Sequence, residues 1–273
     1  MSCTIAITGK GGVGKTTVAG LTVLRLVASG RRPVLAVDAD PNSCLDLALG
    51  VHVAHTVGGV REEARVLAGE GTTTGVAKQE LMRLKVAKSL VETRDFDLIA
   101  MGRPEGPGCY CFANNALRAT LKEIADDYPF VVIDNEAGLE NLSRRIVREL
   151  DLMIMVADPS RQGLETVRRL FALAREMNIK VKQLALVVNR LRRDALPESV
   201  AQLQAETGAA IVAALPDDED LARLSEAGGR LQDLPASNRV VAAIDRLLFE
   251  SAVPMLNASR ESVTSGNARD LKP

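Results

Sequence analysis

Short apolar segments rich in Val, Ile and Leu alternate along the chain with longer segments in which apolar residues recur every three or four positions. The first pattern is typical of strands buried on both faces of a sheet, and the second of helices that pack on such a sheet. The predicted strands are Thr4–Thr8, Pro33–Val37, Asp97–Met101, Phe130–Ile133, Leu152–Val156, Leu184–Val188 and Ala210–Ala213. The predicted helices are Lys15–Ser29, Ala116–Asp127, Leu139–Leu150, Leu164–Met177, Glu198–Thr207, Asp220–Ala227 and Ser237–Glu250. This alternation predicts a three-layer α/β fold, in which a mostly parallel twisted sheet is flanked by helices.

Two parts of the chain depart from this alternation. Residues 52–88 combine short helical patterns with glycine-rich breaks, which indicates a helical insertion with a loop. Residues 259–273 are polar and contain no aromatic residue, so we expect a disordered tail there. The rest of the chain contains no Pro-, Ser- or Gly-rich linker, and we therefore expect a single domain over residues 1–258.

The composition narrows the class of protein without identifying it. The 273 residues are 47% hydrophobic and 25% charged, as in ordinary globular proteins. The 34 Lys and Arg residues against 35 Asp and Glu residues give a net charge of −1, and 3% of the residues are aromatic. A protein whose main role is to bind nucleic acid needs surplus positive charge and side chains that stack on bases. This class is therefore disfavoured.

The cysteines and the amino-terminal segment bear on the compartment. Cys3, Cys44, Cys109 and Cys111 are too few and too unevenly spaced for a disulfide framework, which suggests a reducing environment. The first ten residues lack the basic stretch and apolar run of an export signal. No apolar run approaches the roughly 20 residues that span a bilayer. We therefore expect a cytoplasmic protein.

A glycine-rich segment lies between the first predicted strand and the first predicted helix. Residues 9–17 read Gly-Lys-Gly-Gly-Val-Gly-Lys-Thr-Thr, which satisfies the P-loop pattern G-x-x-x-x-G-K-[ST] in the required order of strand, loop and helix. Its backbone N–H groups and the positive end of the helix are suited to bind phosphate, with Lys15 at the β- and γ-phosphates of ATP and the Thr16 hydroxyl on Mg²⁺. A glycine-rich turn without a ligand is the alternative. The predicted nucleotide-binding residues of this segment are Gly9, Gly11, Gly12, Val13, Gly14, Lys15, Thr16 and Thr17.

Carboxylates follow two further predicted strands. Asp38 and Asp40 lie at alternate positions in Val-Asp-Ala-Asp-Pro-Asn, and Asp134 ends the apolar run Val-Val-Ile-Asp, the form of a Walker B segment. Ligands of open α/β sheets bind at the carboxyl ends of the strands. We expect Asp38 and Asp134 to hold Mg²⁺, directly or through water, and Asp40 to orient the attacking water. Capping of a helix is the alternative role for the first two aspartates.

Cys109 and Cys111 lie in Gly-Pro-Gly-Cys-Tyr-Cys, which we interpret as an extended or turning loop after the third predicted strand. One chain supplies two thiolates, too few for a closed metal site, whereas a two-fold dimer would supply four. Four thiolates suit tetrahedral Zn²⁺, planar Ni²⁺ or an iron–sulfur cluster. Two small buried thiols are the alternative. We interpret Cys3 and Cys44 in that second way, because no further ligand lies near them in the sequence.

Lys10 is a second lysine within the glycine run, which a P-loop does not require. Residues 9–16 resemble the deviant Walker A motif of the superfamily that contains the nitrogenase iron protein and the septum-site and ParA-type ATPases. The resemblance implies that Lys10 crosses a dimer interface to the partner's ATP and that ATP drives dimer closure. It also implies that Gly138 senses the γ-phosphate. The residues that it places at the adenine base are Asn189, Pro216 and Asp218.

The cysteine pair makes the resemblance more specific. Together with Lys10 and Val-Asp-Ala-Asp-Pro-Asn, it resembles the CooC-type nickel-insertion ATPases that mature carbon monoxide dehydrogenase, from about Thr4 to Phe249. This implies hydrolysis of ATP to ADP coupled to formation of a homodimer, with Ni²⁺ or Zn²⁺ held between the subunits by the cysteines. Carbon monoxide dehydrogenase would be the client enzyme. Asn135 and Glu136 depart from the small or Thr-containing residues common after the Walker B aspartate, which leaves the second switch open.

Two other functions remain open on the sequence alone. An electron-transfer iron protein would hold a [4Fe-4S] cluster between two subunits, although nitrogenase-type iron proteins have a Cys after the Walker B strand and this chain has none after Cys111. A ParA- or MinD-type positioning ATPase would bind DNA or a membrane. The basic residues form only local clusters, which a solvated face explains: Arg144-Arg145, Arg168-Arg169, and Arg190 with Arg192 and Arg193. The terminal residues form no basic amphipathic helix. We therefore expect neither nucleic acid nor a membrane among the partners.

Overall fold

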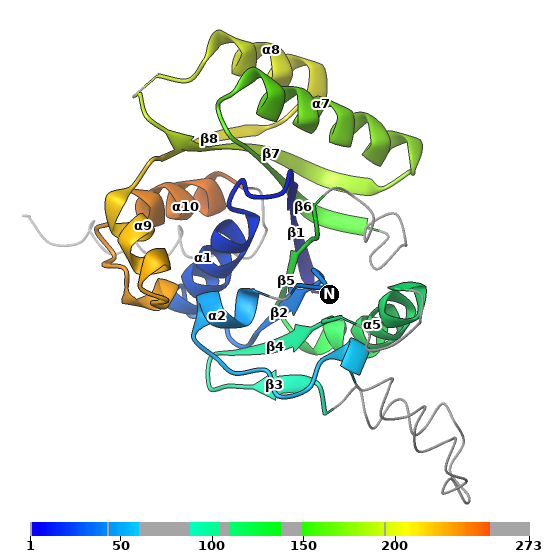
Figure 1. Cartoon of the computed structure of the whole chain (residues 1–273). Helices are drawn as coiled ribbons and strands as arrows, with labels where there is room; N and C mark the ends of the chain where they lie inside the picture. The colour runs from blue at the N-terminus through cyan, green and yellow to red at the C-terminus, as the bar shows by residue number, and fades with distance from the viewer. Residues whose placement is uncertain are drawn as a thin grey trace, which may run out of the picture.

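The computed structural model describes residues 2–42, 44–59, 88–103, 110–137, 149–193 and 195–251. Within them lies an 8-stranded sheet with the strand order β3-β4-β2-β5-β1-β6-β7-β8. The pair β3 and β4 at one edge is antiparallel, and the other neighbouring pairs are parallel. Helices cover both faces of this sheet (Figure 1). The predicted three-layer α/β fold is therefore confirmed.

The elements follow one another along the chain as strand and helix in alternation. The strands are β1 (Cys3–Gly9), β2 (Val34–Asp38), β3 (Leu90–Glu92), β4 (Phe96–Ala100), β5 (Phe130–Asp134), β6 (Glu149–Ala157), β7 (Lys180–Leu191) and β8 (Ile211–Pro216). The α-helices are α1 (Lys15–Ala28), α2 (Leu45–Leu49), α5 (Tyr110–Ile124), α7 (Arg161–Glu176), α8 (Glu198–Thr207), α9 (Glu219–Glu226) and α10 (Arg239–Glu250). Short 3₁₀ turns are η1 (Ala125–Asp127) and η2 (Leu231–Asp233).

Two apolar clusters lie on opposite faces of the sheet. Because side chains alternate along a strand, Ile5 and Ile7 of β1 face one cluster and Ala6 faces the other. The Ile5 cluster packs against α1 and α10, and the Ala6 cluster packs against α5, α7 and α8. Burial on both faces explains why the central strands are nearly continuous apolar runs.

Several boundaries differ from the sequence-based prediction. The edge strand β3 and the short helix α2 lie outside the predicted strand and helix ranges. Residues 139–148 of the helix predicted at Leu139–Leu150 lie outside the described residues, and Glu149 and Leu150 belong to β6 instead. Helix α5 begins at Tyr110 rather than at Ala116, so Cys111 lies in a helix and not in an extended loop.

The predicted insertion, the predicted tail and the domain bounds stay partly predictions. Residues 60–87 of the predicted insertion and residues 252–273, which include the predicted tail, lie outside the described residues. The single domain over residues 1–258 is likewise an expectation. Among the helices that the structure describes, none has the length and apolar character needed to cross a bilayer.

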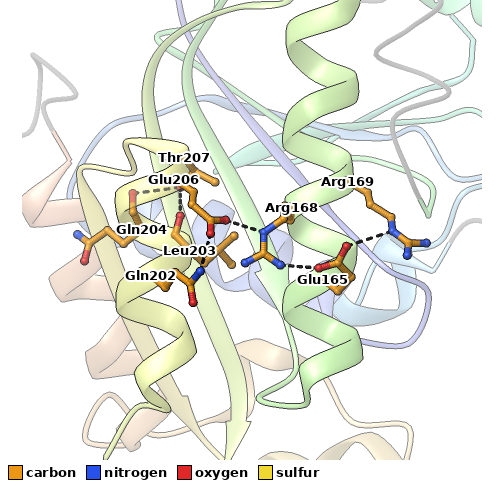
Figure 2. A network of polar contacts seen from close by, with 8 residues as sticks. All are labelled: Glu165, Arg168, Arg169, Gln202, Leu203, Gln204, Glu206 and Thr207. Carbon is orange, nitrogen blue, oxygen red and sulfur yellow. Dashed lines mark hydrogen bonds and ion pairs between the residues drawn. The ribbon is translucent and has the colours of Figure 1, made fainter.

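Helices α7 and α8 are joined by a network of side chains on the outer face of the molecule (Figure 2). Arg168 donates from Nε to Glu206 Oε2 at 2.5 Å and from Nη1 to Glu165. Glu165 also accepts from Arg169 Nε at 3.4 Å, and Glu206 accepts from Gln202 Nε2 at 3.0 Å. Exposed ion pairs of this kind contribute little to stability, because water already solvates both charges well.

Candidate functional site

The glycine-rich segment joins β1 to α1 at the carboxyl edge of the sheet. Gly12 and Gly14 adopt positive φ angles of 77° and 95°, in the region that favours glycine. A Cβ atom at Gly14 would lie 2.4 Å from Asn189 Nδ2, and one at Gly9 would lie 2.3 Å from the carbonyl oxygen of Val156. The segment is therefore pressed against the ends of β6 and β7, where a larger residue does not fit.

Two side chains hold the interior of this loop. Lys15, the first residue of α1, is only 8% exposed, and its Nζ donates to the carbonyl oxygen of Lys10 at 3.3 Å. Asn189 Nδ2 donates to the carbonyl oxygen of Val13 at 2.7 Å. Helix α1 has no side-chain cap and no acidic residue in its first turn, so its positive end adds to the charge of Lys15. The loop therefore has the electrostatics of an anion site.

Asp38 and Asp134 end the adjacent strands β2 and β5 and are paired directly in the sheet register. They are 0% and 1% exposed. Asp38 accepts from the backbone N–H groups of Leu45 at 3.0 Å and Asp40 at 3.1 Å, so it binds the first residue of α2, as the capping alternative expects. Asp134 Oδ1 has no hydrogen-bond partner among the described residues. Because a buried carboxylate oxygen without a partner is costly, this atom fits a cation ligand.

Burial raises the pKa of both carboxyls, that of Asp134 to about 7 and that of Asp38 to about 6. At Asp134 the hydrogen bond from Thr16 and the charge of Lys15 oppose the rise, whereas the negative charge of Asp38 adds to it. The two groups therefore ionise much closer to neutral pH than exposed carboxyls do. A divalent cation between them would favour the ionised forms. The oxygen donor set formed by Thr16, Asp38 and Asp134 fits Mg²⁺.

Asp40 lies in the loop after β2, two residues beyond Asp38. Its Oδ1 accepts from the backbone N of Asn42 at 2.8 Å and from Asn42 Nδ2 at 3.1 Å. Asn42 Oδ1 in turn accepts from Arg103 Nη2. The Asp40 carboxylate is thus oriented by Asn42, which is itself held by Arg103 in the segment after β4. The sequence-based analysis did not single out Asn42 or Arg103, because no local motif links the two loops.

The residues predicted to lie at the adenine base have structural contacts of their own. Asn189 holds the P-loop at Val13, and its Oδ1 accepts from the backbone N of Arg190 at 2.9 Å. Asp218 caps α9 by accepting from the backbone N of Leu221 at 2.9 Å, and it also accepts from Asn238 Nδ2 at 3.0 Å. Pro216 ends β8. Their contact with a base stays a prediction.

A pocket with a volume of about 840 Å³ opens at the carboxyl ends of β6, β7 and β8. Its polar lining includes two carboxylates, Asp158 and Asp217, and three arginines that the sequence-based analysis treated as an ordinary solvated cluster. These arginines are Arg190, Arg192 and Arg193. The pocket adjoins the P-loop through Asn189, which precedes Arg190 in the chain.

The predicted thiolate site falls at a gap in the described residues. Cys109 and the predicted γ-phosphate sensor Gly138 lie outside them, while Cys111 lies in the first turn of α5. Within the ranges that the structure describes, no group of three or more His, Cys, Asp and Glu residues is arranged to hold a metal ion. Cys3 is buried, as predicted, and burial raises its pKa to about 12. The interpretation of Cys44 as a buried thiol was wrong: it is exposed, because it stands at the start of the short surface helix α2.

Known proteins resemble the chain along most of its length. The AAA domain family matches residues 2–186. An uncharacterized ATP-binding protein of Methanocaldococcus jannaschii is 41% identical over 244 residues, which cover 89% of this chain and 96% of that protein. The carbon monoxide dehydrogenase accessory protein CooC of Rhodospirillum rubrum is 30% identical over 269 residues, which cover 93% of this chain and 99% of that protein. The septum site-determining protein MinD of Thermotoga maritima is 25% identical over 232 residues, which cover 82% and 78%.

Solved structures share the fold at lower sequence identity. The cell division ATPase MinD of Pyrococcus furiosus superposes with a TM-score of 0.67 at 22% identity, covering 92% of this chain and 98% of that one. MinD of Pyrococcus horikoshii, solved in complex with Mg-ADP, superposes with a TM-score of 0.66 at 21% identity, covering 99% and 100%. With the family match and the relatives that extend along most of its length, this chain belongs to the AAA domain family and has the fold of the MinD- and ParA-type P-loop ATPases.

Proposed function

We propose that this protein binds ATP with Mg²⁺ and hydrolyses it to ADP and phosphate. The observation that carries the proposal is the juxtaposition, at one edge of the sheet, of a glycine-rich loop that contains a buried lysine and a pair of buried carboxylates. Lys15 is buried within the loop, and Asp134 has a carboxylate oxygen that no described residue satisfies. The name of the relative with 41% identity, an ATP-binding protein, supports the ATP-binding part of the proposal.

The roles of the residues follow from their positions. The backbone N–H groups of the loop and the Lys15 ammonium would bind the phosphates, and Asp40 would orient the attacking water. Thr16, Asp38 and Asp134 would hold Mg²⁺, directly or through water, and the cation would offset negative charge on the phosphate oxygens. Catalysis of phosphoryl transfer rests on such positioning and charge stabilisation rather than on covalent chemistry of the protein. Gly138 would sense the γ-phosphate, and Asn189, Pro216 and Asp218 would lie around the base.

Lys10 has a different environment from Lys15, because its side chain is exposed at the tip of the loop. We propose that it acts on the ATP of a partner subunit in a homodimer. Lys10→Ala should then retain ATP binding in equilibrium titrations but lose both ATP-dependent dimerisation, followed by size-exclusion chromatography, and dimer-dependent phosphate release. A Lys10→Ala protein that dimerises and hydrolyses like the wild type would contradict action in trans.

We further propose that ATP-driven dimerisation serves a CooC-type metallochaperone, with Ni²⁺ or Zn²⁺ as cargo between Cys109 and Cys111 of two subunits. The supporting observations are the Cys-x-Cys spacing and the resemblance to CooC of Rhodospirillum rubrum along 99% of that protein. In addition, α5, which carries Cys111, follows β4, and β4 ends beside Asp38 in the sheet. Carbon monoxide dehydrogenase is the proposed client.

The metal site can be tested by adding Zn²⁺ or Ni²⁺ to the anaerobic protein and measuring bound metal and the dimer fraction. Cys109→Ser and Cys111→Ser should abolish metal-promoted dimerisation and leave ATP binding intact. Cys44→Ser is the matched control, because it removes an exposed thiol outside the pair and should change nothing. Reconstitution that yields an iron–sulfur chromophore without nickel binding would favour an electron-transfer protein. A wild-type protein that binds neither metal nor cluster would favour a MinD- or ParA-type positioning ATPase.

A further inference from the structure

One chain of hydrogen bonds connects the loop after β2 with the loop after β4. Asp40 Oδ1 accepts two N–H groups from Asn42, and Asn42 Oδ1 accepts one from Arg103. These strands are neighbours in the sheet, and Asp38 and Ala100 at their ends are paired in register. The connection therefore spans two adjacent strand ends at the candidate nucleotide site.

The chemistry of Arg103 determines which way the Asn42 amide faces. A guanidinium group only donates hydrogen bonds, so the group that faces it has to be the Asn42 oxygen and not the NH₂ group. The NH₂ group is thereby directed to Asp40, where it donates at 3.1 Å. Without Arg103 the Asn42 side chain would lose the hydrogen bond that holds its oxygen and would be free to swing away from Asp40.

The backbone that carries Arg103 is itself held in place. Met101 donates its N–H to the carbonyl oxygen of Asp38 at 2.8 Å, and the Met101 carbonyl accepts from Gly58 N at 2.8 Å. Gly102 has a φ of 61°, and a Cβ atom there would lie 2.3 Å from Thr56 Oγ1. The backbone before Arg103 therefore has little room to move, and it fixes the position from which the Arg103 side chain extends.

We propose that Arg103 is a positioning residue for ATP hydrolysis, which acts through Asn42 on the orientation of Asp40. The inference rests on the proposed ATPase function.

The chain supplies a matched control across the same two strands. Arg32 precedes β2 and donates from Nη1 to Asp95, which precedes β4. Arg32 therefore links the amino ends of β2 and β4, as Arg103 links their carboxyl ends. Arg32→Ala removes the same kind of side chain from the same pair of strands, at the edge of the sheet away from Asp40.

The test is the steady-state ATPase of the full chain, with kcat and KM for ATP measured separately. Arg103→Ala should lower kcat by about 10-fold, because it loosens the geometry of a reacting group without removing it, and should leave KM unchanged. Asn42→Asp should lower kcat at least as much, since it keeps an acceptor for Arg103 but directs a carboxylate at Asp40. Arg103→Lys, which retains one donor, should restore part of the rate. Arg32→Ala should match the wild type.

A double variant checks that the two residues act as one unit. If Arg103 works through Asn42, Arg103→Ala added to Asn42→Ala should lower kcat no further than Asn42→Ala alone. Arg103→Ala with wild-type kcat, or with a loss that multiplies that of Asn42→Ala, would overturn the inference while leaving the ATPase proposal intact. A wild-type chain without ATP hydrolysis would overturn both.

Discussion

Charged side chains are arranged in opposite ways at the carboxyl edge of the sheet and on the outer face of α7 and α8. On α7 and α8, Arg168 pairs with Glu165 and Glu206, and its hydrogen bonds lower the pKa of both carboxyls. At the sheet edge, burial raises the pKa of Asp38 and Asp134, and Asp134 Oδ1 has no partner among the described residues. On α7 and α8 each of these charges has a partner, and the exposed ion pairs contribute little to the stability of the fold. The arrangement at the sheet edge leaves two buried carboxylates incompletely compensated, and perturbed groups of this kind are typical of functional sites.

Lys15→Ala should have the largest effect on ATP hydrolysis, because it removes the buried positive charge that lies near the carboxylates. We expect ATP hydrolysis, measured as phosphate release, to fall by roughly 100-fold or more, as when a stabilising donor to a transition state is lost. Lys182→Ala is the control, since Lys182 is an exposed lysine that pairs with Asp151 at 2.6 Å away from the loop. Comparable losses in the two variants would remove the distinction between the regions.

Asp134→Asn should separate stability from function. Because the wild-type carboxylate is buried with an unpaired oxygen, the nucleotide-free variant should gain on the order of 1 kcal/mol in the free energy of unfolding at pH 8. The same change should abolish the extra stability that Mg-ADP provides. Both quantities can be measured by chemical denaturation. Asp97→Asn is the matched control: this buried carboxylate accepts from Tyr128 Oη at 2.6 Å and Thr93 N at 3.0 Å, so its replacement should destabilise the protein.

The stability of the nucleotide-free protein should fall as the pH rises. The pKa values of Asp38 and Asp134 are raised on folding, so between about pH 4 and pH 7 the folded chain holds protons that the unfolded chain has released. Each such proton contributes a slope of at most about 1.4 kcal/mol per pH unit. Binding of Mg²⁺ should strengthen over the same range, because it needs the ionised forms. Denaturation at pH 5.5 and pH 8 measures the slope, which should flatten in an Asp38→Asn, Asp134→Asn double variant.

Arg168→Ala should have the smallest effect. It removes two exposed ion pairs that water replaces well, so we expect a small change in the unfolding midpoint and an unchanged rate of ATP hydrolysis. Thermal unfolding at low and high salt checks this, and the difference between variant and wild type should shrink as salt rises. A large drop in the unfolding midpoint of this variant would show that the α7–α8 network contributes substantially to stability.

Much of the fold could be predicted from the sequence, because the periodic apolar positions are the ones that pack in the core. Helix α8 was predicted with its observed bounds, Glu198–Thr207, since Gly208 follows it in the left-handed conformation that ends helices. The strand β5 was predicted to within one residue, because its apolar run lies between two covered faces. The P-loop could be recognised for a similar reason: its glycines are required by packing, since a Cβ atom at Gly14 would clash with Asn189.

What the sequence concealed depends on contacts between distant segments. Strand β3 has only three residues and is held by antiparallel pairing with β4, so no long apolar run marks it. The start of α5 at Tyr110 was missed because glycine and proline in the preceding residues favoured a loop. The links from Asn189 to Val13 and from Arg103 to Asn42 join residues 176 and 61 positions apart, and no local motif announces them.

The two oxygens of Asp38 have a further consequence for the chain that follows β2. Oδ1 accepts from the backbone N–H of Asp40, and Oδ2 accepts from the backbone N–H of Leu45. A single carboxylate therefore binds both ends of the turn that leads into α2. An asparagine offers only one accepting oxygen and would have to release one of these ends. Asp38, which we propose as a ligand of Mg²⁺, thus also holds the loop that carries Asp40. Binding of the proposed cation would therefore bear on the position of that loop.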